Sequence, residues 1–294
     1  MTGRVGGAGL VPVLLLILSI ISLCVGTSLG KTLFPVIGSA GTTSLRIGLA
    51  AMLLAVMQRP WRWRLDRKQL SAVGAYGVVL ACMNLSFYAA VARLPLGIAI
   101  AIEFLGPLCV ALLGSKRPLD LAWAALAAAG VAILVLPGAS GQVSPAGIGF
   151  ALLAALFWAC YIVTGAQAVR IVSQHQIVCL GLCVGSIIAV PAGIAQAGAA
   201  LLQPHVLAGG AMVAVLCSAL PYTLEIMTLK RLSPATFGIL VSLEPAIGAL
   251  AALIILGERL SPLQLAGIAG VVAASAGATL TRPGAPKVPV PATP

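Results

Sequence analysis

The sequence predicts an all-α membrane protein with ten transmembrane helices arranged as two antiparallel five-helix inverted repeats. Three observations favour this fold class: the composition, the recurrence of long apolar runs, and an echo between the two halves of the chain. The 294 residues are 61% hydrophobic and 8% charged, with a mean hydropathy of +1.13. Soluble domains carry roughly 25% charged residues, so most of this chain is expected to lie in lipid.

Apolar runs of about 20 residues recur along the chain, and a helix of that length spans the roughly 30 Å hydrocarbon core of a bilayer. The runs lack the alternating ten-residue pattern of a membrane β-barrel, which favours a helical bundle. Arg4 and the first run resemble a signal peptide, but the run is long and many others follow it, so we expect an uncleaved first helix. The expected spans are residues 10–30, 36–57, 70–92, 95–114, 119–136, 146–169, 174–198, 206–229, 234–256 and 262–281.

The halves of the chain are expected to form two repeats, residues 10–137 and 146–281, joined by a Gly/Ser/Pro-rich linker at 138–145. The proline-rich tail, residues 282–294, is expected to be disordered. An odd number of spans in each half makes the two repeats antiparallel in the membrane, an arrangement typical of secondary transporters with a site near the midplane.

The echo between the halves lies in two short segments, VARLPLGIAIAIEFLGP and LKRLSPATFGILVSLEP, which end at Pro107 and Pro245. At one constant offset these two prolines align. The glutamates do not, because Glu103 precedes its proline by four residues and Glu244 stands immediately before its own. Pro107, Pro245 and Pro221 are expected to interrupt helical hydrogen bonding and to free carbonyl groups.

The net charge of +11 is dispersed over short loops, which indicates membrane topology rather than binding to nucleic acid. Cys179 and Cys183 share a helix face, but no further metal-ligand spacing accompanies them, so neither a metal nor another cofactor is predicted. Enzyme signatures such as a Walker lysine are missing. We therefore expect no enzymatic activity and no ATP hydrolysis by the chain.

Charged residues inside the spans are the main candidates for function. A charge at the bilayer centre costs about 2.5 to 3.5 kcal/mol on insertion scales, so such residues usually face a protein interior or a watery cavity. Arg46, Glu103 and Glu244 are each expected near mid-depth, and Lys31 lies at the end of the first span. A zwitterionic substrate would suit them, with its carboxylate on Arg46 or Lys31 and its ammonium group on a glutamate.

Two other interpretations of these charges remain open. Arg46 and one glutamate could form a buried pair that only fixes helix register. Alternatively, because burial disfavours the charged form of a carboxyl group, the glutamates could take up and release protons during a transport cycle.

Polar groups in neighbouring spans complete the predicted set of substrate-binding or coupling residues. Asn84, Tyr88 and Tyr222 can offer hydrogen bonds at membrane depth, although bonds between helices would explain them equally. Glu225 is the weakest member, because it lies near Lys230 and Arg231 and can pair with them at the membrane surface.

The spans, the repeat and the motifs EPA (244–246) and LGER (256–259) resemble the drug/metabolite transporter superfamily with EamA repeats. More narrowly, five motifs are similar to those of bacterial inner-membrane threonine/homoserine exporters: SLGKTLFP (28–35), LRIGL (45–49), EFLGPL (103–108), ALPYTLE (219–225) and TFGILVSLEPA (236–246). The resemblance implies export of small amino acids, coupled to protons, through the bacterial inner membrane.

Two alternatives stand beside this hypothesis. One is a broader metabolite or drug exporter of the same superfamily, for which an aromatic content of 5% is low. The other is a membrane scaffold that does not transport, in which the buried charges only lock helices together.

The distribution of Lys and Arg over the loops predicts that both termini lie in the cytoplasm. One side of the membrane would hold thirteen basic residues and the other only three. A reporter enzyme that is active only in the cytoplasm should therefore be active when fused to either end. An inactive reporter at both ends would show that the termini lie on the opposite side of the membrane. The basic residues are Arg4, Arg59, Arg62, Arg64, Arg67, Lys68, Lys116, Arg117, Arg170, Lys230, Arg231, Arg282 and Lys287, against Lys31, Arg93 and Arg259.

Overall fold

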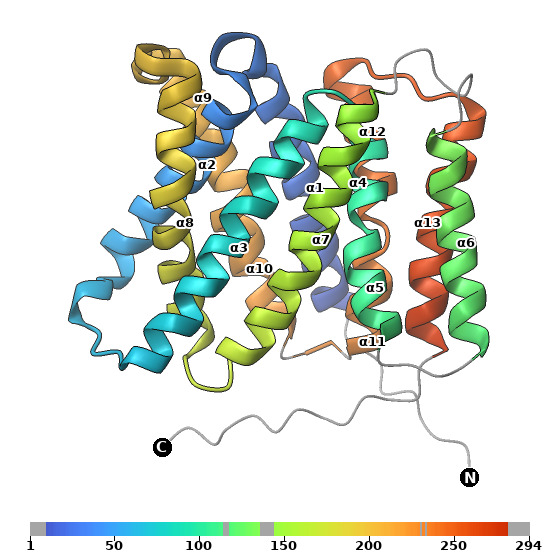
Figure 1. The fold of residues 1–294 in the computed structure, drawn as a ribbon, viewed down its shortest axis with the longest axis horizontal. Coiled ribbons are helices and arrows are strands. Elements are labelled where there is room, and N and C mark those ends of the chain that lie inside the picture. Colours follow the sequence, from blue (N-terminus) through green and yellow to red (C-terminus); the bar gives the residue numbers. More distant parts are fainter. Residues whose placement is uncertain (1–9, 114–117, 136–143, 230, 233, 282–294) are drawn as a thin grey trace.

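The computed structural model describes residues 10–113, 118–135, 144–229, 231–232 and 234–281, and all secondary structure in these ranges is helical. Figure 1 shows the bundle that these helices form. The first half contains α1 (Leu10–Thr32), α2 (Phe34–Gln58), α3 (Arg67–Val91), α4 (Leu96–Glu103), α5 (Leu105–Leu113) and α6 (Pro118–Val135). The second half contains α7 (Pro145–Ala168), α8 (Gln174–Ala197), α9 (Pro204–Ala214), α10 (Leu220–Leu229), α11 (Pro234–Val241), α12 (Glu244–Leu256) and α13 (Pro262–Leu280).

Seven helical segments of the described chain are long and apolar enough to cross a membrane: Leu10–Thr32, Phe34–Gln58, Arg67–Val91, Pro145–Ala168, Gln174–Leu202, Thr236–Leu256 and Pro262–Leu280. Three shorter apolar segments, Leu96–Val110, Pro118–Leu134 and Pro204–Ala219, accompany them. Each expected span overlaps one of these segments, although the span expected at 206–229 extends ten residues beyond Pro204–Ala219. The prediction of a helical membrane protein is thereby confirmed.

Successive long segments run in opposite directions, so the loops gather at the two ends of the bundle (Figure 1). The loops after α2, α7 and α10 share one end with the start of α1 and the end of α13. The loops after α1, α3, α8 and α12 lie at the other end, which we call the outer end because the sequence predicts that it faces away from the cytoplasm. Linker residues 138–143, the tail 282–294 and the basic residues Arg4, Lys116, Arg117, Lys230, Arg282 and Lys287 lie outside the described residues.

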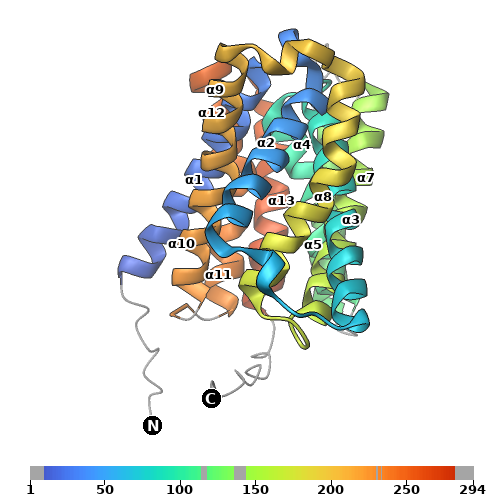
Figure 2. The ribbon, with the colours of Figure 1, turned by 90° about the vertical axis from the view of Figure 1, so that its left-hand side faces the viewer.

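Helix packing divides the bundle into two flanks and a centre. On one flank α2 packs on α8, and α3 packs on α7 and α8; on the other, α6 packs on α13. Figure 2 looks onto the first flank, with α2 and α8 in front. In the centre α1 packs on α10 and α12, and α4 packs on α7 and α12. The centre therefore joins helices from both halves of the chain.

Local sequence signals define where several helices begin. Asp66 accepts a hydrogen bond from the backbone N–H of Gln69, whose side chain in turn accepts from the N–H of Asp66, and this capping box starts α3. Ser261 and Gln264 form the same motif before α13, where Pro262 takes the first helical position. These signals fix helix starts at the ends of the bundle, where water and lipid headgroups meet the protein.

A kink interrupts α2 near its beginning, at Gly38. Its backbone angles, φ 68° and ψ 178°, fall in a region that only glycine adopts without strain. The side chain of Gln196 in α8 provides an acceptor for backbone N–H groups next to the kink. Its Oε1 accepts hydrogen bonds from Ala40 N at 2.7 Å and from Gly41 N at 3.3 Å. The kink therefore also ties α2 to α8.

Replacing Gly38 with alanine should destabilise the protein by about 1–3 kcal/mol, because the residue would be strained and its Cβ would lie 2.3 Å from Gln196 Oε1. The measurement is thermal unfolding of the purified protein in detergent. Gly74→Ala is the matched control, since a Cβ at Gly74 would meet nothing within 4 Å. Equal melting temperatures for the two variants would contradict the role of the kink.

Candidate functional site

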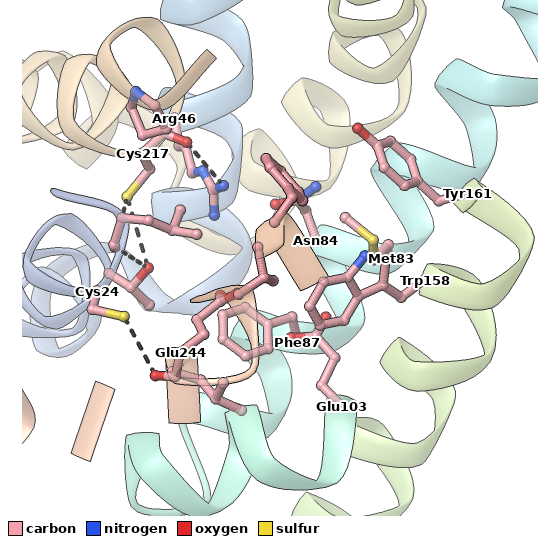
Figure 3. A pocket seen from close by; sticks show the side chains of 16 residues that line it. Cys24, Arg46, Met83, Asn84, Phe87, Glu103, Trp158, Tyr161, Cys217 and Glu244 are labelled. Carbon is pink, nitrogen blue, oxygen red and sulfur yellow. Dashed lines mark hydrogen bonds between the residues drawn. The ribbon is translucent and has the colours of Figure 1, made fainter. Parts of the chain in front are cut away.

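A cavity of about 310 Å³ lies in the centre of the bundle, among helices from both halves. Figure 3 shows its lining side chains. The polar and charged residues around it are Cys24, Thr27, Arg46, Asn84, Glu103, Tyr161, Cys217 and Glu244. Four predicted site residues, Arg46, Asn84, Glu103 and Glu244, thus line one cavity although they come from four different helices.

Interrupted helices place both glutamates at the cavity. Pro107 has no N–H to offer to the carbonyl of Glu103, four residues earlier, and α4 ends at Glu103. Pro245 likewise has no N–H for the carbonyl of Val241, where α11 ends, and α12 begins at Glu244. The predicted interruption of the helices before these two prolines is confirmed. One glutamate therefore ends a helix and the other begins one.

Arg46, from the middle of α2, is held by neighbours on two other elements. Its Nη1 donates to Tyr88 Oη and its Nη2 to the carbonyl oxygen of Cys217, each at 3.4 Å. The guanidinium carbon also lies 5.5 Å from the centre of the Tyr88 ring. Cys217 belongs to a π-helical segment, Val215–Ala219, and stands four residues before Pro221, which cannot donate to its carbonyl. The same proline effect thus supplies an acceptor for Arg46.

The two glutamates differ in exposure. Glu103 is 7% exposed, and its carboxyl group has no hydrogen-bond partner among the described residues, whereas Glu244 is half-buried. Arg46 and Glu244 both lie close enough to Glu103 to interact with its charge. Cys24 Sγ donates to the backbone oxygen of Glu244 at 3.7 Å, which fixes the start of α12 against α1 (Figure 3). The cavity thus combines one cation with two carboxyl groups.

The remaining wall of the cavity is largely aromatic and apolar. Phe87 and Trp158 line it together with Phe237, as Figure 3 shows for the first two. The Trp158 ring packs edge-on against Phe104 at 5.2 Å between ring centres. The hydroxyl of Tyr76 donates a 2.6 Å hydrogen bond to the hydroxyl of Tyr161, which lies one turn from Trp158 on α7. These contacts support Trp158 and Tyr161 at the cavity.

Sequence reasoning did not single out this wall as part of the site, although a signal for it exists. Phe87 lies three residues after Asn84, on the same face of α3, and lines the cavity with it and with Met83. Trp158 and Tyr161 are likewise three residues apart on α7. A search of the positions three and four residues away from each predicted polar residue would have identified Phe87, which follows Asn84 by three. Cys24 and Cys217, which the sequence did not single out, also line the cavity.

The remaining predicted site residues lie outside the cavity lining or outside the described residues. Tyr88 is fully buried behind Arg46. Asn84, which does line the cavity, donates from its Nδ2 to its own helix at Leu80 O, at 2.9 Å. Lys31 does not line the cavity; its Nζ pairs with Glu258 Oε1 at the outer end, at 2.6 Å. Tyr222 and Glu225 belong to α10, but their side chains lie outside the described residues.

The chemistry of the cavity is that of binding. Arg46 can pair with a carboxylate in two parallel hydrogen bonds, and a glutamate can pair with an ammonium group. Within the described chain, no group of three or more His, Cys, Asp or Glu residues could hold a metal ion. The cavity therefore offers charge pairing and an apolar wall to a small charged molecule.

Comparisons with known proteins agree with this chemistry. The EamA-like transporter family matches residues 145–280. The threonine/homoserine exporter RhtA of Escherichia coli K12 is 42% identical over 273 residues, which is 92% of this chain and 92% of the exporter. RhtA of Salmonella typhimurium SL1344 is similar to the same extent, 42% over 273 residues and 92% of each chain.

A solved crystal structure shares the fold. Its TM-score is 0.56 at 19% sequence identity, and the match covers 92% of this chain and 96% of the other. The match to the exporters covers the same share of this chain, 92%, at the higher identity of 42%. This chain belongs to the family of the RhtA threonine/homoserine exporters among the EamA-like transporters, and it is a multi-span membrane transporter rather than an enzyme.

Proposed function

We propose that this transporter exports threonine, homoserine and related small amino acids from the cytoplasm by alternating access. The observation that carries the proposal is the central cavity, which Arg46, Glu103 and Glu244 all line. An amino acid is a zwitterion whose carboxylate and ammonium groups are close together, so a cavity with a cation and two carboxyl groups suits it. Its relatives of 42% identity carry the name threonine/homoserine exporter.

Within the cavity we assign the substrate carboxylate to Arg46 and the ammonium group to Glu244. The two hydrogen bonds of Arg46 to Tyr88 and Cys217 are long, at 3.4 Å, so shorter bonds to a carboxylate can replace them. Glu244 is the more exposed of the two glutamates and therefore the one that a substrate can reach. Its place at the start of α12 favours a negative charge there.

The size of the cavity favours a small substrate. Its volume of about 310 Å³ is near the lower end of the roughly 300–1,000 Å³ typical of small-molecule sites. The aromatic wall of Phe87, Trp158 and Phe237 favours a second candidate, a broader exporter that also accepts apolar or aromatic molecules. Competition for homoserine transport by phenylalanine or by an aromatic cationic dye would distinguish this candidate from the first.

We further propose ten membrane spans in two inverted repeats, divided at residues 138–145. The packing in the centre supports this arrangement. The first span, α1, packs on α10 and α12, which are parts of the eighth and ninth spans, and the sixth span, α7, packs on α3, α4 and α5, which form the third and fourth. In two five-span repeats the first span corresponds to the sixth, and the third and fourth spans correspond to the eighth and ninth. The contacts of α1 are therefore equivalent to those of α7, as expected at an interface between inverted repeats.

We place the protein in the bacterial inner membrane with both termini in the cytoplasm. The described basic residues support this orientation. At one end of the bundle lie Arg59, Arg62, Arg64, Arg67, Lys68, Arg170 and Arg231, whereas the outer end holds Lys31, Arg93 and Arg259. An excess of basic residues marks the cytoplasmic side of a membrane protein.

Proton coupling forms the last part of the proposal, with Glu103 as the proton carrier. Burial disfavours the charged form of a carboxyl group, so a proton and a nearby cation are alternative ways to stabilise it. Glu103 is buried, lies close enough to Arg46 for the two charges to interact, and has no hydrogen-bond partner among the described residues. A substrate carboxylate that engages Arg46 would weaken its interaction with Glu103 and favour uptake of a proton there.

Inverted membrane vesicles that contain the protein should take up radiolabelled homoserine when their interior is acid. Arg46→Gln and Glu244→Gln should each lower the initial rate at least tenfold, about 1.4 kcal/mol, because each removes one partner of the zwitterion. Arg170→Gln, which removes an exposed charge far from the cavity, is the matched control and should leave the rate unchanged. Uptake no greater than in vesicles without the protein would refute the export proposal.

Glu103→Gln should separate binding from proton coupling. The variant should still exchange labelled for unlabelled homoserine across the vesicle membrane, because Arg46 and Glu244 remain. Its uptake should no longer respond to the imposed pH difference, since glutamine cannot carry a proton. A variant that keeps the full response to the pH difference would rule out Glu103 as the proton carrier.

A further inference from the structure

An ion pair closes the outer end of the bundle, above the cavity. Lys31 Nζ, near the end of α1, donates to Glu258 Oε1 at 2.6 Å and to the carbonyl oxygen of Leu94 at 2.8 Å. The other carboxylate oxygen, Glu258 Oε2, accepts from the backbone N–H of Leu96 at 2.8 Å. Two side chains thus join α1, the loop between α3 and α4, and the loop between α12 and α13.

The pair is attached to the cavity by two short helices. Leu96 is the first residue of α4, so Glu258 accepts from the positive end of this helix, and Glu103 is the last residue of the same helix. Glu244 is the first residue of α12, and Glu258 lies two residues beyond its last, Leu256. Each of the two helices therefore carries a cavity glutamate at one end and a contact of the ion pair at the other.

Helices α4 and α12 pack closely against each other between the cavity and the pair. A Cβ on Gly97 would lie 2.7 Å from the Cβ of Ala249, and a Cβ on Gly248 would lie 2.3 Å from Ile100 Cδ1. Ile100 itself lines the cavity. Backbone contact of this kind leaves no room for a substrate, so the route from the cavity to the outer end is shut along this line.

Lys31 also lines a second hollow, which we call the outer hollow, of about 560 Å³, together with Phe34, Gly38 and Gln196 among others. The buried ring of Tyr88 lies between this hollow and Arg46. Its centre is 5.8 Å from the ring centre of Phe34, which lines the hollow, and the Arg46 guanidinium group is also its neighbour. Lys31 therefore faces the outer hollow while it pairs with Glu258. Separation of the pair would leave a cation at the place where an outgoing carboxylate would arrive.

We propose that Lys31 and Glu258 form the latch of the outer gate, and that transport requires this pair to break so that the cavity opens into the outer hollow. The proposal rests on the proposed export function and adds to it the residues that control release. Both side chains remain partly exposed, at 20% and 18%, so water can solvate each charge once the two separate. A partly exposed pair can stabilise the closed state and still separate during transport. A fully buried pair would resist separation, because each charge would be left buried without a partner.

Removal of either charge should expose the cavity to the outer side. Native Cys24 and Cys217 line the cavity and are buried, at 1% and 3% exposure, so they report on its accessibility. Right-side-out vesicles would be treated with a membrane-impermeant maleimide, and modification of these two cysteines would be followed by mass spectrometry of their peptides. Lys31→Gln and Glu258→Gln should each raise the labelling rate several-fold over the unmodified protein.

Two further variants serve as matched controls. Arg259→Gln removes an exposed charge from the same loop as Glu258 and should leave the labelling rate unchanged. Glu258→Asp keeps the charge and should stay close to the unmodified protein. Labelling rates of Lys31→Gln and Glu258→Gln equal to that of Arg259→Gln would overturn the proposal.

Cross-linking tests the latch by holding the gate closed rather than by opening it. The double variant Lys31→Cys and Glu258→Cys, bridged by a reducible thiol cross-linker, should lose homoserine transport, and a reducing agent should restore it. Each single variant treated in the same way controls for the native cysteines. Full transport in the cross-linked double variant would overturn the latch.

Binding of radiolabelled homoserine to the purified protein separates this proposal from the proposed function. If the protein does not bind homoserine, the assigned substrate is wrong, but the labelling of Cys24 and Cys217 still decides the latch. If homoserine binds and labelling does not change in the latch variants, the export function stands and the latch is refuted.

Discussion

The cost of placing charges inside a membrane governs this structure. Arg46, Glu103 and Glu244 lie within apolar helical segments, and an ionisable residue in such a segment usually faces a protein interior or a watery cavity rather than lipid. Proline supplies part of this environment: Pro221 leaves the carbonyl of Cys217 for Arg46, and Pro107 and Pro245 follow the interruptions that bring both glutamates to the cavity. Irregular backbone is tolerated at this depth because protein, rather than lipid, surrounds it.

Much of the fold follows from local properties of the sequence. Long apolar runs and proline, serine and aspartate at helix starts define the helices, and the structure places helices in every expected span. The depth of Arg46, Glu103 and Glu244 follows from their distance to the span ends, so their common cavity could be anticipated. Such features depend on residues that are near each other along the chain, which is why sequence patterns capture them.

Lys31 illustrates what the sequence could not provide. A lysine at the end of a span can serve a substrate or a partner, and its partner Glu258 lies 227 residues away in the chain. Pairing over that distance depends on how α1, α4 and α12 pack, which periodicity does not encode. The same reason explains why the sequence does not predict Trp158 and Phe237 as part of the site. Each is an ordinary apolar residue in its own helix, and the two line one cavity only because the helices pack together.

The two glutamates enter the cavity from opposite ends of their helices, Glu103 where α4 stops and Glu244 where α12 starts. The acidic groups also occupy different positions relative to Pro107 and Pro245, so the two halves of the chain differ in chemistry around these prolines. Glu103 stands at the negative end of one helix dipole and Glu244 at the positive end of another. The two carboxyl groups therefore lie in unlike electrostatic surroundings although they line the same cavity.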